Sequence, residues 1–176
     1  QLAPGHAMKD GRLETVARHC LEAVRPEFAR QVGNGDVIVA GANFGIGSSR
    51  EQAASVLVHL GVAAVVAPSY SGLFLRNAFN VGLLLLTCPR ALDIADGVPL
   101  RFDARAGWIE IEGGVRLATE PIPGFLLDRI DAGGLLPELK RRFGGHAAGR
   151  APAPTPDNTP SDTPAPPTPA TPKDPT

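Results

Sequence analysis

The chain has 176 residues, 43% of them hydrophobic, which suits one domain that is large enough to bury a core. A formal net charge of −1 excludes strong electrostatic attraction to nucleic acid or to an acidic membrane surface. No apolar run approaches the ~20 residues of a membrane span, and the N-terminal residues lack the basic and then apolar layout of a signal peptide.

Cysteine content limits the chemistry further. Only Cys20 and Cys88 are present, far apart in the sequence, so neither a disulfide framework nor a zinc site is expected. A reducing cytosol is the default location, and both thiols are predicted to be small core residues. Because an iron–sulfur cluster is normally held by several cysteine thiolates, this chain cannot hold one alone.

Two helices are predicted before the first strand. Residues 14–24 place Val16, Cys20 and Val24 on one helical face. Pro26 then begins a second, short helix, because proline is favoured in a first turn.

Short apolar runs alternate with helical segments through the middle of the chain. The runs are typical of buried strands, and glycines at positions 61 and 82 end the helices. The predicted strands cover residues 36–40, 63–67 and 83–86, and the predicted helices between them cover 50–60 and 69–80. Because all three runs are apolar on both faces, they predict parallel strands with right-handed crossovers.

The following segment, by contrast, predicts antiparallel pairing. Ile109 and Ile111 alternate with Glu110 and Glu112, which indicates one buried and one solvated face rather than a catalytic pair of carboxylates. The predicted strands are 100–103, 108–112 and 115–118, with Gly113 and Gly114 as a two-residue turn, and helices follow at 123–130 and 135–143. The fold class is therefore α/β: a short, mostly parallel central sheet flanked by helices, plus an antiparallel hairpin region.

The C-terminal part has a different composition. Residues 151–176 are almost wholly Pro, Thr, Ala, Asp and Ser, so they cannot offset the entropy of ordering by burying surface. We expect one domain over residues 1–145 and a disordered, polyproline-biased tail over 146–176. Such a tail serves either as a solubilising appendage or as a docking segment.

The strand at 36–40 leads into the stretch that carries most of the chemistry. Gly41, Gly45 and Gly47 are followed by Ser48, Ser49 and Arg50 and then by a helix, so that unpaired backbone N–H groups, two hydroxyls and a guanidinium enter one volume. Such a turn suits a small carboxylate. Two other readings stay open: either serine could simply cap the helix, and the spacing matches neither the dinucleotide nor the phosphate-loop pattern.

The amino-acid sequence of this stretch matches a known family signature. ANFGIGSSREQA, residues 42–53, closely resembles the NFGxGSSRExA signature of the aconitase swivel domain, which is a separate small subunit in 3-isopropylmalate dehydratase and homoaconitase. The resemblance covers residues 2–143 and implies a swivelling β/β/α domain. It also implies that the family's first strand is missing before Gln1, through truncation, a misassigned start or a real departure. Residues 69–83 resemble the family as well, and place Arg76 and Asn77 at the periphery of the site or in ordinary packing.

The resemblance implies reversible dehydration of a 2-hydroxy di- or tricarboxylate. Ser48 would act as an alkoxide-like base, Arg50 would clamp a substrate carboxylate, and Ser49 would hydrogen-bond it. Gly45 and Gly47 would bring backbone amides close to the substrate. Asn43 would hold the turn in shape, and Glu51 would orient Arg50 or cap the helix.

A large subunit carrying a 4Fe–4S cluster is the implied partner, with no metal bound by this chain. The implied specificity loop holds His6, Met8, Lys9 and Arg12 and departs from the family's usual Tyr-Leu wording, which leaves 3-isopropylmalate, homoaconitate, citrate-like and methylated malate substrates open. Two other classes also remain: a non-catalytic anion-binding or assembly module, and a serine hydrolase. The hydrolase would need a histidine base, from among His6, His19, His59 and His146.

Overall fold

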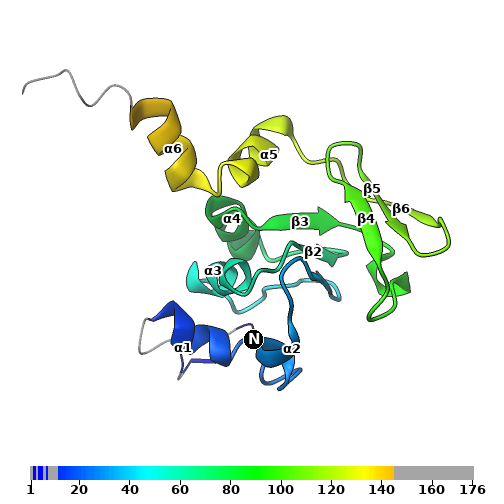
Figure 1. Cartoon of the computed structure of the whole chain (residues 1–176), viewed down its shortest axis with the longest axis horizontal. Coiled ribbons are helices and arrows are strands. Elements are labelled where there is room, and N and C mark those ends of the chain that lie inside the picture. Colours follow the sequence, from blue (N-terminus) through cyan, green and yellow to red (C-terminus); the bar gives the residue numbers. More distant parts are fainter. Residues whose placement is uncertain (1, 3, 6, 8–11, 145–176) are drawn as a thin grey trace, which may run out of the picture. The chain divides into compact units, whose positions relative to one another are not determined.

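Three apolar strands form a parallel sheet in the computed structural model, which describes residues 2, 4–5, 7 and 12–144 (Figure 1). The strands are β1 (Val37–Val39), β2 (Ala64–Ala67) and β3 (Leu84–Thr87), in the order β1-β2-β3. Ile38 pairs with Val65, which pairs in turn with Leu85. The predicted parallel pairing is therefore confirmed. The predicted tail at 146–176 lies outside the described residues, as do His6, Met8 and Lys9 of the loop.

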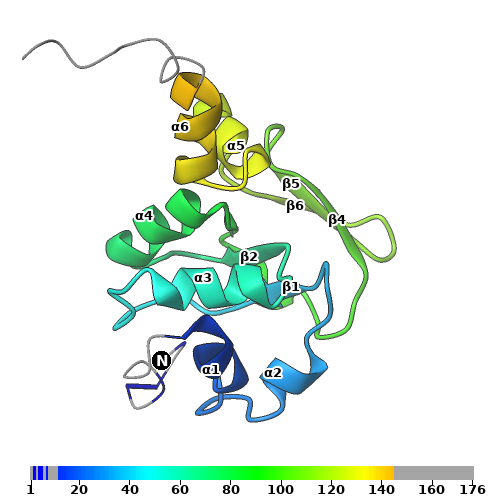
Figure 2. The ribbon, with the colours of Figure 1, turned by 60° about the vertical axis from the view of Figure 1, so that its left-hand side comes forward.

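The two crossover helices pack against each other beside this sheet, as Figures 1 and 2 show. They are α3 (Gln52–His59) and α4 (Gly72–Val81). Both end where a glycine takes a left-handed conformation, at Gly61 and Gly82, as the sequence predicts. Their inward residues include Leu57 and Phe74, which are both fully buried.

The first helix is shorter than its sequence predicts. α1 (Leu13–Arg18) packs against α3, and Val16 and Cys20 are buried as expected, but Val24 is 75% exposed. The cause is a turn at Leu21, which has a φ of +57° and whose N–H donates to the carbonyl of the distant Leu2, so the chain leaves the helix before Val24. The short α2 (Phe28–Gln31) follows Pro26 and buries Phe28.

The second sheet is antiparallel, as predicted. It contains β4 (Leu100–Asp103), β5 (Trp108–Ile111) and β6 (Arg116–Ala118), in that order. Ile109 is fully buried, and Glu110 pairs with Arg116 at 2.8 Å, so the glutamates do lie on a solvated face. The hairpin turn is one residue longer than expected, because the Ile111 N–H donates to the Val115 carbonyl and encloses residues 112–114.

The antiparallel sheet joins the parallel one at the end of β3. The Glu120 N–H, just after β6, donates to the Thr87 carbonyl at 3.0 Å. A short helical turn that the sequence did not predict, η2 (Ala91–Asp93), leads from β3 towards β4. The closing helices are α5 (Gly124–Asp131) and α6 (Leu135–Phe143), and both pack on α4.

Candidate functional site

The glycine-rich turn, residues 41–51, lies where β1 and β2 end side by side. Parallel neighbours bring their carboxyl ends to one sheet edge, so the segment after β1 meets the segment after β2. There the Phe44 N–H donates to the Ser69 carbonyl at 3.0 Å, and the Ser71 N–H donates to the Phe44 carbonyl at 2.9 Å. The Asn43 N–H also donates to Ser69 Oγ at 2.8 Å. These bonds extend the β1–β2 pairing into the turn and fix its first half.

The backbone of the turn depends on residues with positive φ. Asn43, Gly45 and Gly47 have φ values of +59°, +83° and +78°. At Gly45 the requirement is also steric, since a Cβ there would lie 2.3 Å from Cγ of Phe74. At Gly47 a Cβ would meet open space. The turn is therefore packed on α4 through Gly45 and is open at Gly47.

Ser48 is the buried polar residue of the turn. It is 9% exposed, and its N–H donates to the Gly45 carbonyl at 2.9 Å, whereas Ser49 and Arg50 are exposed. Neither serine caps α3, which begins at Gln52, two residues later than predicted, without a side-chain cap. Within the described part of the chain, the amide N–H groups of residues 49–52 have no acceptor. Four such donors at a helix start suit an anion.

Residues of α4, and Tyr70 just before it, contact the turn and hold it in place. Asn77, 6% exposed, donates from Nδ2 to the Ser49 carbonyl at 3.1 Å. Phe44 packs edge-to-face on Phe74 and on Tyr70. The Tyr70 hydroxyl lies within hydrogen-bond distance of the Val65 and Leu86 carbonyls, and burial raises the pKa of Tyr70 above its ordinary value. This hydroxyl therefore stays protonated and ties the start of α4 to β2 and β3.

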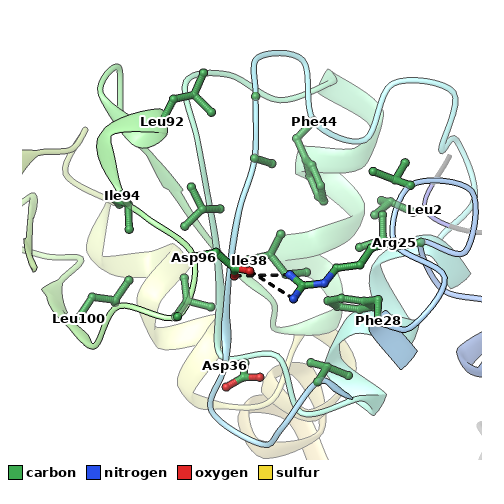
Figure 3. Close-up of a pocket in the computed structure, with 18 of the residues that line it drawn as sticks. Leu2, Arg25, Phe28, Asp36, Ile38, Phe44, Leu92, Ile94, Asp96 and Leu100 are labelled. Carbon is green, nitrogen blue, oxygen red and sulfur yellow. Dashed lines mark hydrogen bonds and ion pairs between the residues drawn. The ribbon is translucent and has the colours of Figure 1, made fainter. Parts of the chain in front are cut away.

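A cavity of about 1210 Å³ opens beside the turn along the free edge of β1 (Figure 3). Apolar side chains dominate its walls, among them Phe28, Ile38 and Leu100. Arg25 and Asp96 form an ion pair between the walls, with 3.2 Å between Arg25 Nη2 and Asp96 Oδ2. The β1 residues are half-buried, so the prediction of a fully buried first strand was wrong.

The predicted site residues divide between this cavity and solvent. Asn43, Gly45 and Ser48 line the cavity, whereas Gly47, Ser49 and Arg50 do not. Arg12 is exposed just before α1. Sequence reasoning left Asn77 between a role at the site and ordinary packing. Asn77 follows Phe74 by three residues and so shares the inward face of α4, where a buried polar side chain needs a hydrogen-bond partner. This position is the sequence signal for its contact with the turn.

The described residues contain neither a metal site nor a histidine beside Ser48. No group of three or more His, Cys, Asp or Glu side chains in this part of the chain could hold a metal ion. Cys20 and Cys88 are free and buried, and burial raises the pKa of Cys20 to about 12. His19 pairs with Glu22, and His59 lies at the far end of α3 from Ser48, so neither described histidine pairs with that serine. No described helix is both long and apolar enough to cross a bilayer.

Known proteins share both the sequence and the fold. The family described as the Aconitase C-terminal domain matches residues 15–91. The 3-isopropylmalate dehydratase small subunit 1 of Methanopyrus kandleri is 41% identical over 143 residues, which are 80% of this chain and 84% of that protein. The methanogen homoaconitase small subunit of Methanothermobacter thermautotrophicus is 41% identical over 136 residues, 77% of this chain and 79% of that protein.

A solved structure confirms the predicted fold class. The crystal structure of 3-isopropylmalate dehydratase from Methanocaldococcus jannaschii superposes with a TM-score of 0.74 at 37% identity. The match covers 80% of this chain and 84% of that one. Its identity and coverage are similar to those of the sequence relatives.

Proposed function

This chain belongs to the aconitase family, among the small subunits of 3-isopropylmalate dehydratase and homoaconitase, and from this premise we propose that its glycine-rich turn forms half of a hydro-lyase active site. The chain is a small subunit of such an enzyme. One observation carries the site assignment: Ser48 is buried at the edge of a turn whose following amides, residues 49–52, lack acceptors within the described chain. The proposed substrate is a 2-hydroxy di- or tricarboxylate.

The reaction poses two problems for the protein. Dehydration removes a weakly acidic proton from the carbon next to a carboxylate and a hydroxyl group from the adjacent carbon, leaving a double bond and water. The proton needs a base. The hydroxyl needs an electrophile, because hydroxide is a poor leaving group.

We assign the base to Ser48 Oγ. A free serine hydroxyl is far too weakly acidic to serve, so its anion needs stabilising dipoles and charge. The four unpaired amides at the start of α3 and the guanidinium of Arg50 can supply them. The side chain's burial increases the strength of these interactions by excluding water.

Substrate binding falls to the exposed side of the turn. Arg50 matches the two oxygens of a carboxylate with its planar fork, and Ser49 donates to the same group. Gly47 leaves open space where a side chain would stand, so substrate can approach the backbone. Gly45 and Asn43 hold the shape of the turn through their positive φ values.

The electrophile must come from elsewhere. Cys20 and Cys88 are both buried and far apart in the chain, so the described residues do not fit a 4Fe–4S cluster. We place the cluster on a large subunit, where it would act as a Lewis acid on the leaving hydroxyl. The small-subunit naming of the relatives supports such a partner.

Both 3-isopropylmalate and homoaconitate are candidate substrates, since a 3-isopropylmalate dehydratase small subunit and a homoaconitase small subunit are each 41% identical to this chain. We propose that the loop containing His6, Met8, Lys9 and Arg12 selects between them. The test combines co-purification with the large subunit, anaerobic reconstitution of the cluster and a screen of several 2-hydroxy acids. Binding of these acids without turnover by the complex would instead favour a non-catalytic anion-binding module.

Two variants test the residue roles in the reconstituted complex. Ser48→Ala should lower kcat by at least about 10³-fold with subunit assembly unchanged, because the base is lost. Arg50→Lys should mainly raise KM, because a point charge replaces a two-pronged donor. Steady-state kinetics and size-exclusion chromatography measure both effects. Wild-type kinetics in both variants would refute the site assignment.

A further inference from the structure

Asn77 is the point at which α4 holds the second half of the turn. Its side chain is 6% exposed, and its Nδ2 donates to the Ser49 carbonyl at 3.1 Å across the boundary between α4 and the lead into α3. Within the described residues, this is the only hydrogen bond made by the backbone groups of the peptide unit that joins Ser49 to Arg50. The first half of the turn, by contrast, is held by three bonds from residues 69–71.

Because a peptide unit is planar, this single bond also sets the direction of the Arg50 N–H. In a planar trans peptide, the carbonyl of one residue and the N–H of the next point in opposite directions. When Asn77 draws the Ser49 carbonyl towards α4, the Arg50 N–H must therefore point away from α4. The Arg50 N–H belongs to the run of amides, residues 49–52, that have no acceptor within the described chain, so it is left available to a ligand.

We infer that Asn77 is a positioning residue: its amide fixes the Ser49–Arg50 peptide so that the Arg50 N–H and guanidinium face the substrate carboxylate. The inference rests on the proposed function of the turn. Asn77 touches no reacting atom, and it acts through the Ser49 carbonyl alone. Phe74, one turn earlier on α4, supports the same turn through its packing on Gly45.

Three variants isolate this role. Asn77→Ala removes the side-chain amide, and Asn77→Asp keeps its shape but replaces the donor by an ionised acceptor. Asn80→Ala is the matched control, because it makes the same deletion one turn later on α4, at a side chain that faces Arg129 instead of the turn. Urea unfolding of each chain first establishes its stability.

The first measurement needs no reaction. In the isolated chain, malate is titrated while the backbone amide NMR signals of residues 49–52 are followed. Both Asn77 variants should bind malate about tenfold more weakly than wild type and displace the Arg50 amide signal in the free chain, since the peptide is no longer held. Asn80→Ala should match wild type in both respects.

The second measurement uses the reconstituted complex. Each Asn77 variant should lower kcat/KM by about 10- to 100-fold, mostly through KM, because a carboxylate donor is misplaced. A wild-type complex with no activity would refute the proposed function but leave the malate titration to decide on Asn77. Asn77 variants that match Asn80→Ala in both measurements would overturn the inference. Loss of the fold in both would also overturn it, in favour of a general structural role.

Discussion

β1 and β2 have nearly the same sequence, VIV and AVVA, and pair residue for residue in one sheet, yet they differ in burial. All four residues of β2 are fully buried, whereas all three residues of β1 are half-buried. β2 lies between two strands. Among the described residues, β1 has one strand neighbour and a cavity along its other edge.

The difference extends to the backbone. The Asp36 carbonyl accepts from the Ala63 N–H, just before β2, and the Ala40 N–H donates to the Val66 carbonyl in β2. The alternation of a parallel ladder therefore turns the N–H and C=O groups of Val37 and Val39 towards the cavity. Apolar composition therefore makes both segments strands but does not decide which one carries the core. The apolar side chains of β2 form part of the buried core, whereas β1 mainly positions the turn that follows it.

The largest expected effect is in the turn that follows β1. Gly45→Ala should destabilise the chain by about 3 kcal/mol or more, because it combines a steric clash with Phe74 and a positive φ. Gly47→Ala is the matched control, since it has a similar φ but open space, and should cost about 1 kcal/mol. Urea unfolding measures both. Equal losses would mean that Phe74 yields and that the turn is not packed on α4.

An intermediate effect separates the two strands directly. Val66→Ala in β2 removes fully buried methyl groups and should cost about 2 kcal/mol, whereas Val39→Ala in β1 should cost about 1 kcal/mol or less. The same unfolding experiment applies. If Val39→Ala proved as costly as Val66→Ala, the edge of β1 would be covered in solution.

The smallest effect concerns the ion pair at the cavity. Arg25 and Asp96 are 53% and 82% exposed, so Arg25→Ala should change stability by less than about 1 kcal/mol, and the change should shrink as salt is added. Thermal unfolding at low and high salt measures it. A larger, salt-independent loss would show that the aliphatic part of Arg25 packs on the cavity wall and matters more than its charge.

Local patterns predicted most of the fold. The apolar runs around Val65 and Leu85 became strands, and Gly61 and Gly82 ended helices, because both signals act within a few residues. The sequence also identified the turn, since the signature that it matches is long and specific. These features require no knowledge of what lies opposite them in space.

Features that depend on distant segments were not predictable in the same way. The early end of α1 follows from the bond between Leu21 and Leu2, which are far apart in the chain. The half-burial of β1 depends on a cavity whose other walls come from Leu2 and from residues within 21–32 and 92–102, which are far apart in the chain. The bond from Asn77 to Ser49 joins α4 to the turn before α3, 28 residues earlier in the chain, so the residue type suggested a partner without identifying it.

The two cysteines give the chain a built-in reporter of its own opening. Cys20 is 1% exposed and Cys88 is fully buried, and the raised pKa of Cys20, about 12, keeps its sulfur in the unreactive protonated form. An alkylating reagent should therefore label Cys20 only during the moments when the segment between α1 and α2 detaches. Counting labelled molecules over time would then give the frequency of those moments.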